Sequence, residues 1–179
     1  IMGLLIGYPD ATTGTLIITQ AIPLPVYGIE TAVNTASVEM QVLLSQITQI
    51  VDQISPSHRI IGWYPSHPFD PMAHSHCHLS FTDVNTQLRL QAVSPWWIAL
   101  VVDPLRSLLY QNFEFGVYRC YPGNDSVALE YAAEHEFLTP DGHQGLPGSK
   151  DAFVARWGGQ YTRYYQLYTF YFATTLTSR

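Results

Sequence analysis

The chain has 179 residues, of which 47% are hydrophobic and 12% are charged, and its formal net charge is −6. This length and composition fit one folded domain with a hydrophobic core and exclude an intrinsically disordered chain. The eight lysines and arginines form no basic stripe, so nucleic acid is not expected as a partner. No apolar run approaches the roughly 20 residues that span a bilayer, so no membrane partner is expected either.

The first third of the chain predicts two strands, a helix and a third strand. Apolar and β-branched residues at 2–8 and 15–21, on either side of a turn with proline and glycine, predict a strand–turn–strand unit. Apolar residues at spacings of three and four between Asn34 and Ile54 predict an amphipathic helix. Residues 59–64 then predict a short buried strand, and Pro65 and Pro68 predict that it does not continue in a central ladder.

The remainder of the chain predicts a second helix and further strands. Ser80–Asp83 matches a capping box and predicts a helix that runs to about residue 92. Strands are predicted at residues 96–102, 113–121 and 164–174. Residues 122–160 are rich in glycine, proline and acidic side chains, which indicates a long insertion. The alternation of strands and helices predicts an α/β fold.

Four stretches resemble, in the right order, the JAMM/MPN family of zinc isopeptidases, which cut ubiquitin-like modifiers from lysines. They are Met2–Gly7, Arg59–Tyr64, Cys77–Gln87 and Ala99–Ser107. One such match would be weak, but four in sequence are specific and extend to about residue 121. The resemblance implies an α/β MPN domain, with a curved mixed sheet flanked by helices. We expect a single N-terminally truncated MPN domain over residues 1–179, with the variable insertion at about 122–160.

Three further stretches narrow the resemblance to the signalosome branch of the family. They are residues 24–34, 116–122 and 164–172. Residues 29–34 argue against the ubiquitin-specific proteasome-lid branch. The signalosome resemblance implies a deneddylase subunit, which removes a ubiquitin-like modifier from cullins. The implied partners are other signalosome subunits, especially another MPN-domain protein, and the modified cullin substrate. The implied localisation is the cytoplasm and the nucleus.

The resemblance also assigns the residues of a zinc site. A catalytic zinc takes three protein ligands and keeps one position open. By position, His67 corresponds to the second histidine ligand of the family and Asp83 to its aspartate ligand. Ser80 corresponds to the serine that stabilises the tetrahedral intermediate. The glutamate that serves the family as a base would fall immediately before Ile1.

The family's first histidine ligand is replaced here by Pro65, which has no side-chain donor. The loop between His67 and Ser80 is also longer than in the family, and it carries histidines at 74, 76 and 78. Such a histidine-rich tract is a compositional sign of metal binding. We therefore predict one zinc ion, with His76 as the replacement ligand. The alternative is that these histidines are solvated loop residues.

Two functions remain open on these residues. One is a zinc-dependent isopeptidase, which is favoured by the retention of His67, Ser80 and Asp83. The other is a catalytically inactive MPN scaffold that pairs with another MPN protein, which is favoured by Pro65. Ser80 and Asp83 would cap a helix in either case.

Overall fold

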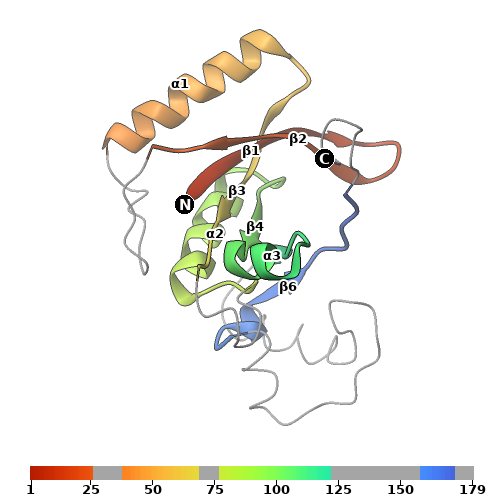
Figure 1. The fold of residues 1–179 in the computed structure, drawn as a ribbon. Helices are drawn as coiled ribbons and strands as arrows, with labels where there is room; N and C mark the ends of the chain where they lie inside the picture. Colours follow the sequence, from red (N-terminus) through yellow and green to blue (C-terminus); the bar gives the residue numbers. More distant parts are fainter. Residues whose placement is uncertain (26–37, 69–76, 122–157, 172–179) are drawn as a thin grey trace.

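The structure is a computed structural model that describes residues 1–25, 38–68, 77–121 and 158–171 (Figure 1). In chain order its elements are β1 (Met2–Asp10), β2 (Thr15–Pro23), α1 (Val38–Ile54), β3 (Arg59–Pro65), α2 (Phe81–Val93), β4 (Ile98–Val102), α3 (Pro104–Tyr110), β5 (Phe115–Cys120), a 3-10 helix (Tyr161–Arg163) and β6 (Tyr164–Gln166). Within these ranges no helix is long and apolar enough to cross a membrane.

The strands form one mixed sheet in the order β2-β1-β3-β4-β5-β6. Strands β3 and β4 run parallel, and every other neighbouring pair is antiparallel. Helix α2 lies in the crossover between the two parallel strands, which need such a long connection. Figure 1 shows α1 beyond the β1–β2 end of the sheet and α2 beside β3 and β4. The predicted α/β fold with a mixed sheet and flanking helices is confirmed.

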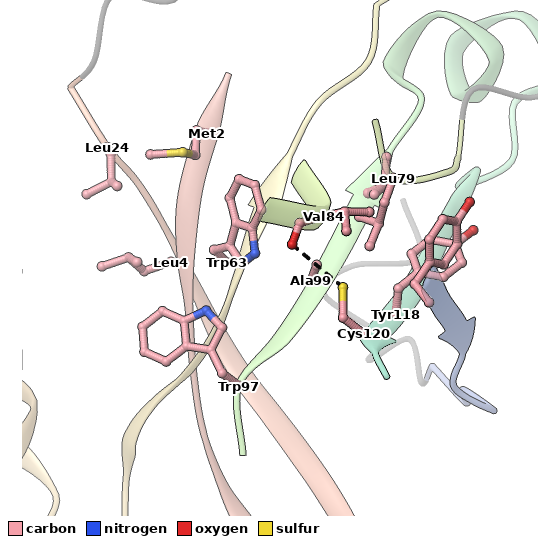
Figure 2. Close-up of a cluster of buried hydrophobic side chains, with 12 residues drawn as sticks. Met2, Leu4, Leu24, Trp63, Leu79, Val84, Trp97, Ala99, Tyr118 and Cys120 are labelled. Atoms are coloured by element: carbon pink, nitrogen blue, oxygen red, sulfur yellow. Dashed lines mark hydrogen bonds between the residues drawn. The ribbon is translucent and has the colours of Figure 1, made fainter. Parts of the chain in front are cut away.

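Alternating strand residues bury both faces of this sheet. In β1, Leu4 belongs to the larger buried cluster and its neighbour Leu5 to the smaller one, as the period of two in a strand requires. Helix α2 contributes Val84 to the larger cluster. Figure 2 shows Val84 opposite Ala99 of β4 and Cys120 of β5. The larger cluster therefore fixes α2 against the middle of the sheet.

The structure differs from the sequence expectations mainly after β4. Strand β4 ends at Val102, and Asp103-Pro104 then begins α3, a helix that the sequence did not predict. The Asp103 side chain accepts the backbone N–H of Arg106 at 3.0 Å, and proline suits the first turn of a helix. Strand β6 is shorter than predicted, because residues 167–171 are described but lie outside any strand. Most of the predicted insertion, residues 122–157, lies outside the described ranges.

Candidate metal centre

The end of β3 positions His67 at the edge of the parallel strands β3 and β4. Gly62 allows β3 to approach β4 closely, since a Cβ at this position would stand 2.5 Å from the carbonyl oxygen of Ile98. At the end of the strand the backbone N–H of His67 donates to the carbonyl of Val102 at 2.9 Å. The neighbouring N–H of Ser66 donates to the carbonyl of Ile1 at 2.9 Å. His67 is therefore held between β4 and the beginning of β1.

The first turn of α2 brings Ser80 and Asp83 to the same place. The Ser80 side chain accepts the backbone N–H of Asp83 at 3.2 Å, and Asp83 Oδ2 accepts the backbone N–H of Ser80 at 2.8 Å. This reciprocal pair is a capping box, with aspartate in the place of the usual glutamate. It fixes the rotamer of Asp83 while leaving the Ser80 side chain exposed.

His67 and Asp83 form a buried pair. His67 Nε2 lies 3.1 Å from Asp83 Oδ2, and only 8% and 7% of the two residues are exposed. Burial alone would raise the pKa of Asp83. The hydrogen bonds with His67 and Ser80, together with the charge on His67, outweigh burial and lower this pKa below its ordinary value. Asp83 is therefore an ionised acceptor, as metal ligation requires.

The pair fits one side of a zinc site, but the described residues do not complete the site. Two donors on one tetrahedral zinc, with bonds of about 2.0–2.1 Å, stand about 3.3 Å apart. The 3.1 Å between His67 and Asp83 matches this spacing. Pro65 is buried at the end of β3 and supplies no donor. Within the described ranges, no three or more His, Cys, Asp or Glu side chains form a group that holds a metal.

The sequence-predicted site residues therefore divide into two sets. The structure brings His67, Ser80 and Asp83 together, although they are separated along the chain. His76 lies outside the described residues, and so does His74. The structure also brings in His78, whose ring centroid lies 6.1 Å from that of His67. A signal for His78 was present in the alternating histidines at 74, 76 and 78.

A buried amide network behind the site was missed by the sequence reading. Gln87 is 0% exposed, and its Oε1 accepts the indole N–H of Trp63 at 2.8 Å. Its Nε2 donates to the carbonyl of Trp97 at 2.9 Å and to Gln91 Oε1 at 2.8 Å. Gln91 in turn exchanges hydrogen bonds with the backbone of Cys120. The network locks α2, and with it Asp83, onto β3 and β5.

This arrangement defines an MPN-type α/β domain with a histidine–aspartate pair at the N-terminus of the crossover helix. The family model described as "JAB1/Mov34/MPN/PAD-1 ubiquitin protease" matches residues 1–95. The chain belongs to this family. The match includes His67, Ser80 and Asp83, so it spans all the site residues that the structure brings together.

The chain is also similar to curated relatives within the family. It is 33% identical to COP9 signalosome complex subunit 5 of Dictyostelium discoideum, over 98% of this chain and 47% of that protein. It is 32% identical to subunit 5a of Arabidopsis thaliana, over 99% of this chain and 44% of that protein. It is 30% identical to subunit 5 of Drosophila melanogaster, over 100% of this chain and 49% of that protein. The chain thus spans about half the length of the curated relatives that it matches.

Proposed function

We propose that this chain carries the zinc-isopeptidase domain of a COP9-signalosome-like complex, where it removes a ubiquitin-like modifier from cullin lysines in the cytoplasm and nucleus. The observation that carries the proposal is the buried His67–Asp83 pair, which stands beside Ser80 at the N-terminus of α2. The similarity to COP9 signalosome subunit 5 from several organisms supports the choice of complex. Other signalosome subunits, including a second MPN protein, are the proposed partners.

In this proposal His67 and Asp83, whose side chains lie 3.1 Å apart, would hold the zinc ion. When bound, zinc supplies Lewis acidity toward the scissile carbonyl and a water molecule. Ser80 stabilises the negative charge that develops on the carbonyl oxygen. Its oxygen accepts the Asp83 N–H, so its own hydroxyl proton is free to be donated. Both the cap and the chemistry therefore use one serine.

The proposed site needs two further groups, a third ligand and a base. The sequence places a third ligand among the inserted histidines, with His76 as its first choice. By resemblance, the family's glutamate would fall just before Ile1. The backbone of Ile1 lies beside Ser66, which is next to His67.

The test is the cleavage of a cullin fragment that bears a ubiquitin-like modifier on a lysine, measured on the purified zinc-supplemented protein within its complex. We expect cleavage by the unaltered protein and its loss in Asp83→Asn, because the amide is a poor zinc ligand. Asp52→Asn is the matched control, since Asp52 is an exposed residue of α1, and it retains activity. Cleavage that survives Asp83→Asn overturns the proposal.

Pro65 specifically favours a second candidate function, a catalytically inactive MPN scaffold. A proline at the first ligand position removes a donor that the chemistry needs. The scaffold predicts that zinc is absent from the purified complex and that cleavage is absent in every variant. It also predicts that Asp83→Asn leaves pairing with the second MPN subunit unchanged. Zinc content measured by mass spectrometry distinguishes the two functions before any activity is assayed.

A further inference from the structure

We infer that His78 is the third zinc ligand of this chain. It replaces the family's first histidine ligand, whose position is occupied here by Pro65. The inference rests on the proposed zinc-isopeptidase function and names one residue within it. His78 lies two residues before Ser80, on the segment that leads into α2. It therefore approaches the His67–Asp83 pair from the helix side, whereas residue 65 would approach it from β3.

The distance between the two histidines suits a shared metal. The ring centroids of His67 and His78 lie 6.1 Å apart, with an angle of 71° between the rings. Two imidazoles on one tetrahedral zinc have centroids about 5 Å apart, given bonds of about 2.0–2.1 Å. In the structure, His67, His78 and Asp83 do not form a group that could hold a metal ion. In the proposed zinc complex a rotation of the His78 side chain brings the two ring centroids closer by about 1 Å.

Gly158 makes room for the His78 ring. A Cβ at this glycine would stand 2.6 Å from His78 Cδ2 and 3.1 Å from Nε2. Gly158 has a φ of 73°, a left-handed conformation in which residues with a side chain are strained. Because the Cδ2–Nε2 edge of the ring is nearest to Gly158, the opposite edge, which carries Nδ1, is directed away from it. Nδ1 is a buried atom and is the one we assign to the metal.

Two buried tyrosines hold the backbone on which His78 sits. The hydroxyl of Tyr118, on β5, donates to the carbonyl of Cys77. The hydroxyl of Tyr164, on β6, accepts the backbone N–H of Leu79. The two rings pack edge to face with centroids 5.2 Å apart, and both side chains are nearly fully buried. The residues on both sides of His78 are thus tied to the sheet, which limits the positions that its ring can reach.

These contacts favour His78 over His76, the choice from sequence alone. A ligand whose backbone is held by the fold loses little conformational entropy when it binds a metal. Leu79 is 0% exposed within the larger core cluster, and it adjoins His78 directly. The ring of His78 also lies beside the ring of His67.

The test is zinc binding by the purified protein, followed by competition with a chromophoric chelator. We expect one zinc per chain in the unaltered protein, and affinity more than about 100-fold weaker in His78→Ala. A lost ligand should exceed the roughly 10–100-fold effect of altering a ligand's supporting partner. His58→Ala is the matched control, because His58 is half-buried and lies at the other end of β3. It should bind zinc as the unaltered protein does.

A second variant tests the same idea without deleting the ligand. Gly158→Ala should displace the His78 ring and weaken zinc binding by about tenfold, the scale of a disturbed supporting contact. In His78→Ala, the added change Pro65→His should restore zinc binding, because it returns a donor to the family's position. Restored zinc binding in this double variant would show that His78→Ala does not lose zinc merely because it fails to fold.

Nuclear magnetic resonance of the unaltered protein tests the same inference without any substitution. In 15N spectra of the histidine rings, zinc addition should shift the Nδ1 resonance of His78 together with the Nε2 resonance of His67. Zinc binding that leaves the His78 resonances and the His78→Ala affinity unchanged overturns this inference but keeps the isopeptidase. A protein that binds no zinc at all overturns the proposed function itself, and the two failures are therefore distinguishable.

Discussion

Single residues of this domain serve structure and chemistry together. Asp83 Oδ2 accepts the N–H of Ser80 and also meets His67 Nε2, so one oxygen both caps α2 and faces the proposed metal. Charge-assisted hydrogen bonds of this kind are stronger than neutral ones. A helix cap thereby fixes the position of a proposed ligand before any metal binds.

At the residue scale, the first prediction concerns Gln87. In Gln87→Leu the indole N–H of Trp63 and the carbonyl of Trp97 both lose their partner inside the core. An unsatisfied buried polar group costs about 1–3 kcal/mol. We therefore expect the free energy of unfolding to fall by about 2–5 kcal/mol in urea titrations. Gln53→Leu, at an exposed position of α1, serves as the control and should change stability by less than about 0.5 kcal/mol.

At the scale of the element, the N-terminus of α2 carries both the capping box that the sequence predicts and two residues of the candidate site. The capping box satisfies backbone groups that the first turn of any helix leaves open. The same turn is packed against the sheet through Val84, which is 0% exposed. Helix α2 therefore presents Ser80 and Asp83 as a rigid pair, because its first turn is fixed by both the cap and the core.

The second prediction separates the two roles of Ser80. Ser80→Ala removes the cap and should lower the free energy of unfolding by about 1 kcal/mol. Ser80→Asn keeps a capping oxygen and should restore most of that stability. Neither variant retains the hydroxyl proton, so both should lose isopeptidase activity by about 100-fold or more. Urea unfolding and the cleavage assay, run side by side, provide the check. Activity that follows stability across the two variants would contradict a chemical role for Ser80.

At the scale of the whole molecule, β5, β6 and the start of α2 are joined by buried ionisable groups. Burial raises the pKa of Tyr118 and of Tyr164 well above the ordinary tyrosine value. Burial likewise raises the pKa of Cys120 to about 12. The Cys120 thiol also donates to the carbonyl of Val84 on α2 (Figure 2). All three groups are therefore neutral in the folded protein and stabilise it only while they keep their protons.

The third prediction is a loss of stability at alkaline pH. The unfolded chain releases these protons near pH 8.5 for the thiol and near pH 10 for the phenols, roughly at their ordinary values. Above those values the folded state binds more protons than the unfolded state, so stability falls as pH rises. Each group contributes a slope of about 1.4 kcal/mol per pH unit. Urea unfolding between pH 8 and pH 11 measures the slope.

Tyr118→Phe is the diagnostic variant for that slope. It removes one titrating group, so above pH 10 the decline in stability should be less steep by about 1.4 kcal/mol per pH unit. Tyr110→Phe is the control, since Tyr110 is an exposed residue of α3 and should leave the slope unchanged. An identical slope in Tyr118→Phe and in the unaltered protein would contradict the assignment.

Much of the fold was predictable because it depends on local patterns. The apolar spacing between residues 34 and 54 and the capping box at Ser80–Asp83 each specify an element within a few residues. Helix α3 was missed because Asp103-Pro104 signals both the end of a strand and the start of a helix. Which reading holds depends on the hydrogen bond from Arg106, which is visible only once the chain is folded.

By itself the sequence determined the family, the order of the elements from β1 to β4 and the candidate ligands His67 and Asp83. The family and the candidate ligands follow from residue types at fixed spacings. Such spacings are a property of the sequence and do not depend on folding. Only the tertiary structure decided that His78 lies beside His67, because this contact depends on Gly158 and on the tyrosines of β5 and β6. Those residues are far from His78 along the chain, and no local pattern encodes how closely they pack.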